Sequence, residues 1–464
     1  MASAASSVPI SPAPSIRSVD VSGSSTPTRS TPTGAAEKAP DDSSKLKIFL
    51  GILKRFIGVS DIAAVRFSLP AQLLEPTPNL EYWNYLDRPE TFISIGDSED
   101  PLGRMLGVLR FWFTKDLKYV KGKPCKPYNS ALGEFFRCNW EVADDLPIIL
   151  GKGANSAPAS GNGTPTNKPV RVSYLTEQTS HHPPVSAFYV DCPEKGISAR
   201  GFDQLSAKFT GTSIRVTPGA HNLGIFVTLH HRNDEQYQLT HPAAHLGGLL
   251  RGSLSVTVSD ACFVTCPKTK LKVILNYVEE GWLGKTQNKV EGVIYKCDPE
   301  TDTRTRAKDV PEKDVVARVE GCWTDKMYFT LGSAPFNKSS AKEYRFKQDK
   351  TLLVDLNPLF PIPKIIPPED AQLPNESRRF WSGVTEAIIN KQYTQATNIK
   401  QELEERQREK AAERKARNAE WQPRFFTGVT TPVGKPELSA DGREALHGLQ
   451  MGEWRLKESA ETGA

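Results

Sequence analysis

Between residues 170 and 331 the sequence contains a series of short segments in which apolar and polar side chains alternate. A period of two is typical of half-buried β-strands, and turn residues separate the segments. Many short strands without long alternating helices predict an antiparallel sheet or barrel and argue against βαβ units. The predicted strands are Val170–Tyr174, Gly224–Leu229, Gly252–Val258, Leu271–Leu275, Val293–Tyr295 and Met327–Leu331.

The regions around this β-rich centre differ from it in composition. Residues 1–44 contain twelve Ser, six Pro and no aromatic residue, so they are predicted to be disordered. Residues 151–168 are rich in Gly, Ser, Asn and Pro and are predicted to form a flexible loop. Beyond Pro374 we expect helices, with twelve charged residues among the eighteen of Lys400–Arg417, and then a C-terminal tail over residues 428–464.

Composition limits the classes of function. The net charge of +5, from 59 Lys+Arg and 54 Asp+Glu, gives no reason to expect a nucleic-acid partner. No apolar run approaches the ~18 residues of a membrane-spanning helix, and the sequence does not open on a secretion signal. The seven cysteines are scattered without a CxxC pair. We interpret them as buried free thiols, as suits the cytosol, and expect neither a metal nor a cofactor.

The most unusual string is EQTSHHPPVSA at residues 177–187. Adjacent side chains of a strand point to opposite faces, but Pro183 keeps His182 out of the helical region and the two prolines end strand pairing. At the rim of a sheet both imidazoles can then face one anion; the alternative is a turn with two surface histidines. Ser180 beside His181 is not a catalytic triad, a third metal ligand is missing, and no nucleophile elbow or phosphate-binding glycine motif occurs. The residues therefore disfavour an enzyme.

Two further strings carry cations. In KPYNSALGE, residues 126–134, prolines beside lysines describe a rigid loop that can hold Lys126 near a phosphate, although lysines in such loops are mostly solvated. Lys400, Glu404 and Arg408 lie on successive turns of one helix face. The same spacing commonly forms exposed ion pairs worth ~0.3–0.5 kcal/mol each, so both interpretations stay open.

Together these strings resemble the oxysterol-binding proteins and their relatives, a family of lipid-transfer proteins, in the short form found in fungi. EQTSHHPP differs from the usual EQVSHHPP at Thr179, and KPYNSALGEFF is similar to KPxNPxLGE with Ser130 in place of Pro. KQELEERQR resembles the family helix motif KxxLEExQR, and WQPRFF resembles its closing W-x-P-x-F-F. PNESRRFW is similar to PxDSRxR, with Glu376 for Asp and Phe380 for Arg. The 44 residues before the resemblance are too few for a pleckstrin-homology domain or ankyrin repeats, so we expect a short-form member of the family.

The resemblance implies one lipid-binding domain over residues 45–427. Its fold would be an incomplete antiparallel β-barrel around an apolar tunnel, with flanking helices, an N-terminal lid and a helical C-terminal region. By motif, the two histidines would bind the 4-phosphate of phosphatidylinositol 4-phosphate, the three cations would add donors, and Glu404 would orient them or accept from an inositol hydroxyl. The implied headgroup residues are Lys126, Asn129, His181, His182, Lys400, Glu404 and Arg408.

A protein that carries a lipid through water also needs a lid. A two-chain phospholipid has on the order of thirty methylenes worth ~0.8 kcal/mol each when buried, so a carrier needs a covered apolar cavity. We interpret residues 45–62 as that lid. Ser43 or Ser44 can cap an amphipathic helix at its start, and Gly58 follows where the helix would end. A peripheral membrane anchor and a plain core helix stay open as alternatives. The side chains expected to face lipid are Leu46, Phe49, Leu50, Leu53, Phe56, Ile57 and Leu69.

The implied function is transfer between membranes without enzymatic chemistry. The chain would act as a cytosolic monomer that contacts anionic membranes peripherally at endoplasmic reticulum, Golgi or plasma membrane contact sites. It would exchange the phosphoinositide for phosphatidylserine or a sterol; LPAQLLEP, which begins at Leu69, is similar to a region of phosphatidylserine-transferring relatives and slightly favours that lipid. The alternative is a phosphoinositide or sterol sensor or scaffold without net transfer.

Overall fold

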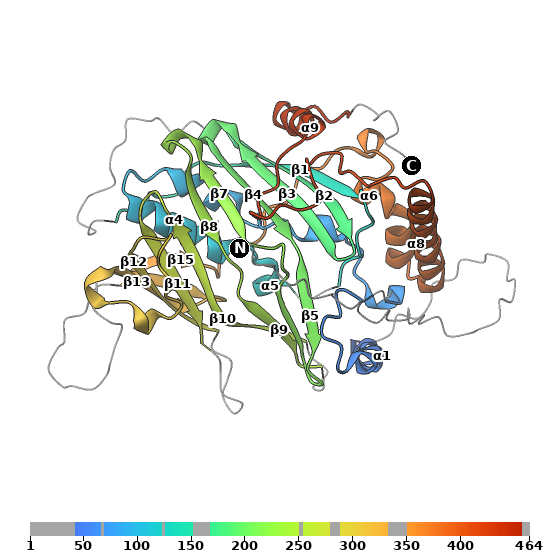
Figure 1. The fold of residues 1–464 in the computed structure, drawn as a ribbon, viewed down its shortest axis with the longest axis horizontal. Coiled ribbons are helices and arrows are strands. Elements are labelled where there is room, and N and C mark those ends of the chain that lie inside the picture. Colours follow the sequence, from blue (N-terminus) through green and yellow to red (C-terminus); the bar gives the residue numbers. More distant parts are fainter. Residues whose placement is uncertain are drawn as a thin grey trace, which may run out of the picture.

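The computed structural model describes residues 42–65, 69–122, 126–151, 168–249, 254–278, 288–332 and 350–456. Its dominant element is one large antiparallel sheet (Figure 1). The strands are β1 (Phe135–Val142), β2 (Val170–His181), β3 (Pro184–Cys192), β4 (Ile197–Asp203), β5 (Leu205–Phe209), β6 (Ile214–Pro218), β7 (Ile225–Leu229), β8 (Glu235–Leu239), β9 (Ala243–Gly247), β10 (Ser255–Cys266), β11 (Leu271–Tyr277), β12 (Lys289–Lys296), β13 (Val315–Cys322), β14 (Lys326–Leu331) and β15 (Thr351–Asp355).

The sheet curves without closing. Its main path runs β1-β2-β3-β4-β7-β8-β10-β11-β12-β13-β14-β15, and β5, β6 and β9 form a side branch that joins β10. All of these pairs are antiparallel. The predicted strands correspond to β2, β7, β10, β11, β12 and β14, except that residues 252 and 253 lie outside the described part of the chain. The predicted antiparallel, incompletely closed sheet with flanking helices is therefore confirmed.

Helices lie before and after the strands in the sequence. They are α1 (Asp42–Leu53), α2 (Asn79–Tyr82), α3 (Pro89–Ile93), α4 (Pro101–Thr114), α5 (Lys118–Lys121), α6 (Ser377–Phe380), α7 (Ser382–Ile389), α8 (Tyr393–Ala416) and α9 (Ala440–Met451). Short 3₁₀ turns are η1 (Lys54–Phe56), η2 (Ala71–Leu73), η3 (Ser94–Gly96), η4 (Pro193–Lys195), η5 (His230–Arg232), η6 (Ala307–Asp309), η7 (Glu312–Asp314) and η8 (Glu369–Ala371).

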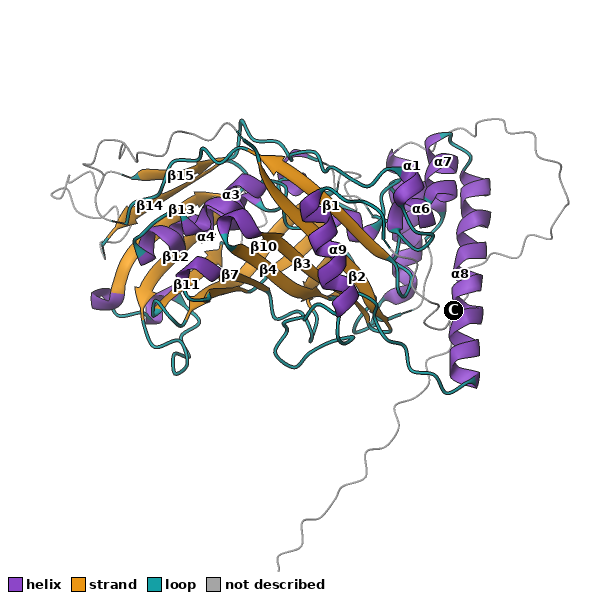
Figure 2. Ribbon diagram, turned by 90° about the horizontal axis from the view of Figure 1, so that it is seen from above, coloured by secondary structure: helices purple, strands orange, loops and turns teal. Residues whose placement is uncertain are grey.

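The sheet curves round α4, whose apolar side chains belong to the main core together with side chains from both ends of the strand path (Figure 2). Asp100 caps this helix by accepting from the N–H of Gly103, and a proline occupies its first turn. The buried guanidinium of Arg104 donates to both carboxylate oxygens of Glu235 on β8, at 2.7 and 2.8 Å. These contacts fix α4 inside the curve of the sheet.

A second core lies at the opposite end, where α1, α6, α7 and α8 gather beside the sheet (Figure 2). Leu53 of α1, Val384 of α7 and Ala396 of α8 pack there with Phe209 and Ile214 from the β5–β6 branch. The first helix begins at Asp42, three residues earlier than expected, and ends at Leu53. The predicted disordered head and flexible loop lie, apart from residues 42–44, 151 and 168, outside the described residues.

The C-terminal region corrects the sequence analysis. Instead of a tail, residues 428–456 include α9, capped by Ser439 and ended by Gly452 at φ +77°. Its apolar side chains Ala445, Leu446 and Leu449 cover the outer face of the sheet. Sequence patterning missed this helix because only one narrow stripe of it is apolar.

The six cysteines in the described ranges are free thiols, and four of them are buried. In the same ranges, none of the helices is long and apolar enough to span a bilayer, and no group of three or more His, Cys, Asp or Glu could hold a metal ion.

Candidate functional site

The histidine pair lies at the tip of the β2–β3 hairpin. His181 faces Pro184 across the hairpin, and the peptide bond between His182 and Pro183 is cis. The register slips between Gln178 and Ser180, as in a β-bulge, which re-aims the side chains that follow. Both imidazoles are exposed and their ring centroids are 4.6 Å apart, edge to face. Two neighbouring rings so placed can contact the same phosphate group.

The Lys126 loop is held between two other segments. The ammonium of Lys126 donates to the side-chain oxygen of Asn129 at 2.6 Å and to the carbonyl of Pro127 at 3.1 Å, so this lysine and its amide neighbour lie together. The carbonyl of Lys126 accepts from the N–H of Glu75 at 3.1 Å. The loop therefore presents Lys126 and Asn129 from a fixed backbone.

A buried carboxylate, Glu134, closes this loop. It accepts from the N–H of Ala131 (2.9 Å), the hydroxyl of Ser377 (2.7 Å) and the indole N–H of Trp381 (3.0 Å). Burial raises its pKa to about 7, although all three hydrogen bonds favour the charged form. Glu134 thus joins the loop to α6 and to the tryptophan that precedes α7.

Glu376, which stands where the motif usually has Asp, also has a buried partner. Its carboxylate accepts from the guanidinium of Arg137 on β1, with 3.2 Å between Nε and Oε1, and both side chains are buried. Burial raises the pKa of Glu376 and lowers that of Arg137. The pair fixes the PNESRRFW segment against the sheet.

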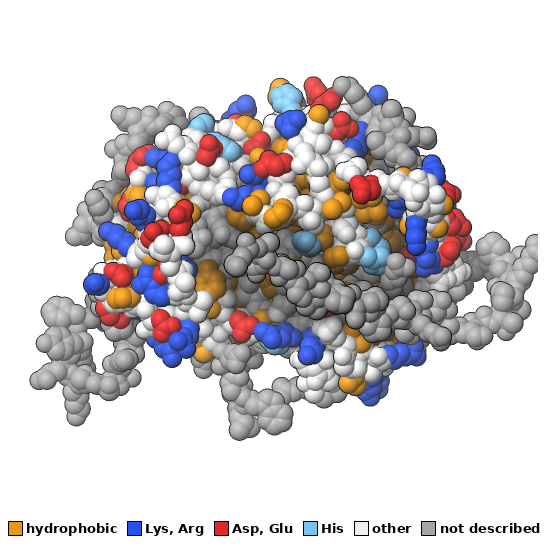
Figure 3. Space-filling model, in the orientation of Figure 1, with side chains coloured by type: hydrophobic (Ala, Val, Ile, Leu, Met, Phe, Trp, Pro, Cys, Tyr) orange, Lys and Arg blue, Asp and Glu red, His pale blue; other side chains and the backbone are white. Residues whose placement is uncertain are grey.

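The charged helix α8 divides the predicted cations into two environments. Lys400 is only 5% exposed and pairs with Glu404 at 2.9 Å. Arg408 is exposed and donates from Nε to Glu405 at 2.8 Å. At the edge of the molecule formed by α8, on the right of the view, basic and acidic side chains lie beside one another (Figure 3), as on a helix with exposed ion pairs. Lys400 and Glu404 are together as predicted, whereas Arg408 has an acidic neighbour of its own.

The motifs meet at residues 421–426, which we call the closing segment. Trp421 lies over Gly133, where an added Cβ would be 2.5 Å from the indole, and Arg414 of α8 stacks on the same indole at 5.6 Å. The ring of Phe425 lies 4.7 Å from that of Phe135. The closing segment therefore contacts the loop, β1 and α8.

The strand that leads to the histidines is tied to the same region. The N–H of Gly133 donates to the carbonyl of Gln178 at 3.0 Å, and the N–H of Gln178 donates to the carbonyl of Glu134 at 2.8 Å. Glu177 accepts from the backbone of the closing segment. Glu177 and Gly133 stand within the EQTSHHPP and KPYNSALGE strings, and that position is the only sign of them in the sequence; no role was predicted for Glu177.

The predicted lid residues lie mostly in the second core. Leu46, Leu53, Phe56 and Leu69 are buried, and Phe49 and Leu50 are partly buried. Ile57 is 64% exposed, because the helix has already ended and Ile57 is extended after η1. Ile52, which was not predicted, is buried in its place. The exposed surface of this segment carries Lys47, Ile48, Lys54, Arg55 and Ile57.

A polar cluster that the sequence analysis missed lies inside the curve of the sheet. Tyr85 donates to Asp203 at 2.6 Å and stacks on His241, and the ammonium of Lys115 lies 4.5 Å from the Tyr85 ring centre. Burial raises the pKa of Asp203 to about 7 and, with help from Lys115, lowers that of His241 to about 3. His241 is therefore neutral at physiological pH.

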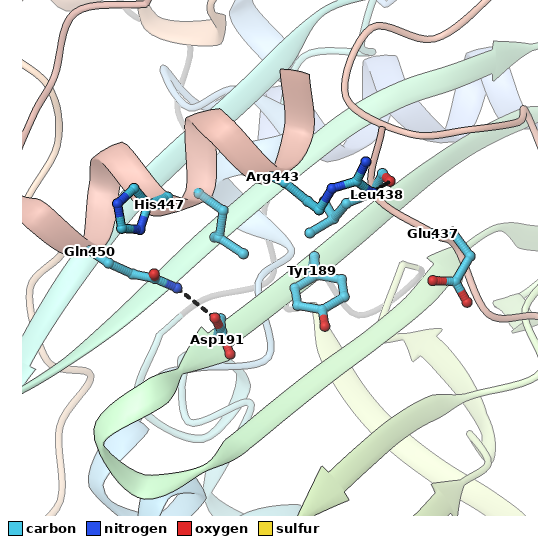
Figure 4. A pocket seen from close by; sticks show the side chains of 8 residues that line it. Tyr189, Asp191, Glu437, Leu438, Arg443, His447 and Gln450 are labelled. Carbon is cyan, nitrogen blue, oxygen red and sulfur yellow. Dashed lines mark hydrogen bonds between the residues drawn. The ribbon is translucent and has the colours of Figure 1, made fainter. Parts of the chain in front are cut away.

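Two cavities lie on the outer face of the sheet, away from these motifs. One of about 290 Å³ lies between β3 and α9, with Tyr189 and Asp191 below and Arg443, His447 and Gln450 above (Figure 4). Gln450 donates to Asp191, whose pKa is raised by burial. The other, of about 240 Å³, is lined by side chains that include Phe226 and Lys435. Neither contains a predicted headgroup residue.

Comparison with known proteins gives one family. A family model described as "Oxysterol-binding protein" matches residues 48–458. Oxysterol-binding protein-like protein 1 of Schizosaccharomyces pombe is 40% identical, over 89% of this chain and 92% of that protein. Human Oxysterol-binding protein-related protein 9 is 29% identical over 77% of this chain, and the match spans 44% of the human protein.

Solved structures share the fold. The Osh1 ORD domain in complex with ergosterol aligns with a TM-score of 0.62 at 20% identity, over 86% of this chain and 88% of that one. The same domain in complex with cholesterol gives 0.63 at 19% identity, over 91% and 93%. The Osh3 ORD from Saccharomyces cerevisiae in complex with PI(4)P gives 0.56 at 17% identity, over 90% and 95%.

Proposed function

This chain belongs to the oxysterol-binding protein family, and on that premise we propose that it transfers lipids between membranes, exchanging phosphatidylinositol 4-phosphate for a second lipid. The second lipid is phosphatidylserine or a sterol. Support comes from the solved structures that share the fold, which hold ergosterol, cholesterol and PI(4)P. The chain acts as a carrier and not as an enzyme.

The observation that carries the proposal is the junction between the Lys126 loop and the strand of the histidine pair. Backbone hydrogen bonds join Gly133 to Gln178 and Gln178 to Glu134, so the loop and the end of β2 form one rigid unit. A phosphomonoester carries about −1.5 to −2 charges and needs fixed, charge-assisted donors when it leaves water. Lys126, Asn129, His181 and His182 supply such donors from this unit, with Lys400 as a further cation from α8.

The acyl chains need a dry cavity with a cover. We assign the cover to α1, whose buried side chains pack with Leu69 and the ends of the β5–β6 branch. We assign the cavity to an apolar tunnel beneath this cover. Both lipids would compete for that tunnel, so the phosphoinositide gradient sets the direction of transport.

The exposed surface of α1 and η1 fits contact with an anionic membrane. Lys47, Lys54 and Arg55 lie beside Ile48 and Ile57, a mixture of cations and apolar side chains that suits a lipid headgroup region. We therefore place the protein peripherally, as a monomer, at contacts between organelle membranes.

Transfer between two vesicle populations tests this proposal. One population holds phosphatidylinositol 4-phosphate and the other holds phosphatidylserine or a sterol. The wild-type protein is expected to equilibrate both lipids, and His181→Ala with His182→Ala to stop phosphoinositide extraction while the circular dichroism spectrum stays unchanged. The adjacent pair His230 and His231 on η5 gives the matched control, His230→Ala with His231→Ala.

Two results would contradict the proposal. Normal extraction by the His181/His182 variant would remove the headgroup assignment. Stoichiometric binding of the phosphoinositide with no movement of either lipid between vesicles would instead identify a sensor or scaffold.

A further inference from the structure

The carboxylate of Glu177 on β2 is buried against the backbone of the closing segment. It is 1% exposed, and its two oxygens accept from the N–H groups of Arg424 and Phe425, both at 2.8 Å. Burying a carboxylate is costly unless its oxygens are hydrogen-bonded. Desolvation raises the pKa of Glu177 to about 7, and these backbone donors oppose the rise. A neutral side chain would fill the same space at lower cost, so the arrangement points to a role for the two hydrogen bonds.

A second side chain of β2 holds the chain just beyond the closing segment. Thr179 is fully buried and its hydroxyl donates to the carbonyl of Val429 at 2.7 Å. The usual valine of the family motif could not make this bond. Glu177 and Thr179 lie four and two residues before His181, so β2 is fastened on its outer side immediately before the histidine turn.

The segment held in this way reaches the other half of the headgroup site. Trp421 packs on Gly133 of the Lys126 loop, three residues from Arg424. The loop and the histidine turn are therefore connected in two ways. One connection is the hydrogen bond between Gly133 and Gln178. The other runs from Glu177 on β2 to the closing segment, and from there to the loop. Two independent connections fix an angle between two segments better than one.

We propose that Glu177 is a positioning residue for headgroup binding, which holds the closing segment so that the Lys126 loop and the His181–His182 turn keep the spacing that a phosphate requires. This inference rests on the proposed function. It predicts that loss of the two backbone hydrogen bonds weakens phosphoinositide binding while binding of the lipid tails is preserved.

The test compares Glu177→Gln with Glu141→Gln in the full chain. Glutamine keeps the size of the side chain but turns an amide N–H₂ toward one of the two backbone donors. Glu141 lies on neighbouring β1 and pairs with Arg171 at the surface, so it gives a matched control. Binding is measured to vesicles with phosphatidylinositol 4-phosphate and, separately, to vesicles with a candidate second lipid, either phosphatidylserine or a sterol. Hydrogen exchange follows the amides of Arg424 and Phe425.

We expect Glu177→Gln to bind the phosphoinositide about tenfold more weakly, as for one lost hydrogen bond to a charged group, with faster exchange at the amide that faces the glutamine N–H₂. Uptake of the second lipid should stay within about twofold of the wild-type value, and the control should match the wild type in all three measurements. Unchanged phosphoinositide binding would overturn the inference, and so would an equal loss of both lipids, which would mean a general structural role.

Failure of the proposed function would be visible before any variant is compared, because the wild-type protein itself would not bind the phosphoinositide; the inference then falls with it. If Glu177→Gln does not fold, Trp421→Ala replaces it. Trp421 is half-buried, and its loss separates the closing segment from the loop. The same selective loss of phosphoinositide binding is expected, and its absence would overturn the inference.

Discussion

The outer edge of the Trp421 indole lies against Gly133, 288 positions earlier in the chain, with no room for a side chain between them. Gly133 also has a φ of +76°, a left-handed conformation that L-residues other than glycine rarely adopt. This one contact joins the closing segment to the loop that presents Lys126, so the glycine is required by both conformation and space.

Gly133→Ala is expected to lower the free energy of unfolding by about 2 kcal/mol or more, from left-handed strain plus the collision with the indole. Gly211→Ala gives the control, since Gly211 has a φ of +95° with nothing within 4 Å of an added Cβ. That variant should lose only about 1 kcal/mol. Denaturant titration of both proteins measures the difference, and equal losses would show that the indole moves aside.

Lys126→Ala should weaken binding to phosphatidylinositol 4-phosphate vesicles by about tenfold or more, because a charge-assisted donor is worth roughly 1.5–3 kcal/mol. Vesicle co-sedimentation measures the change, which should shrink as salt is added. Lys350→Ala removes a cation that pairs with Glu320 on β13 and should bind as the wild type does. Equal binding by both variants would remove Lys126 from the headgroup set.

Glu134 should make stability depend on pH. Its pKa is about 7 in the folded protein and about 4.5 when exposed, so the folded state holds its proton more tightly. The unfolding free energy should therefore fall as pH rises from about 4.5 to about 7, by up to ~3 kcal/mol for this group. Glu134→Gln removes the titration, and the difference between wild type and variant across this range isolates it. A difference that does not change with pH would show that Glu134 is charged throughout.

Thr179→Val should cost about 1 kcal/mol of stability, because the carbonyl of Val429 loses its hydrogen-bond donor while the shape of the side chain is kept. Thr179→Ser keeps the hydroxyl and should retain that hydrogen bond. Thermal unfolding of the two variants measures the contrast. A valine variant as stable as the serine variant would mean that water or another donor replaces the threonine.

Substitutions at Leu53 and Ile57 should distinguish the contribution of the first helix to core packing from its contribution to membrane contact. Leu53 is 1% exposed, so Leu53→Ala should lower the unfolding free energy by about 2–4 kcal/mol. Ile57 faces solvent, so Ile57→Ser should leave stability within about 0.5 kcal/mol and reduce association with anionic vesicles several-fold. If Ile57→Ser binds vesicles normally, this end of α1 does not touch the membrane.

The period of two in the sequence predicted the central strands because alternation follows directly from the geometry of a half-buried sheet. Strands buried on both faces were harder to predict. β1 is covered by the main core on one side and by the closing segment and α9 on the other, so Arg137 and Asn139 are buried as well and no alternation remains. Its residues could be placed only through the motif that precedes it.

The headgroup residues came from motifs, and the contacts between those motifs could not be predicted. Glu177 meets Phe425 and Gly133 meets Trp421 across more than 240 positions, and such pairings depend on the whole sheet. Helix periodicity placed Lys400, Glu404 and Arg408 on one face, but burial distinguishes them: Lys400 is buried and paired with Glu404, whereas Arg408 meets Glu405 in solvent. The exposure of Ile57 could not be predicted either, because it depends on where the helix ends and on the backbone conformation that follows.

The side-chain amide of Asn139 on β1 donates to the carbonyl of Leu449, and the guanidinium of Arg171 on β2 donates to the carbonyl of Gln450. These hydrogen bonds attach α9, the last helix, to the first two strands of the sheet. A fragment cut at residue 427 would lose Leu438, Ala445, Leu446 and Leu449 from the apolar cluster that also contains Leu175, Val185 and Phe202, and so would expose part of that cluster to water. Such a fragment should aggregate during purification. If it failed to carry lipid, the cause would be its exposed apolar surface, and the result would say nothing about headgroup binding.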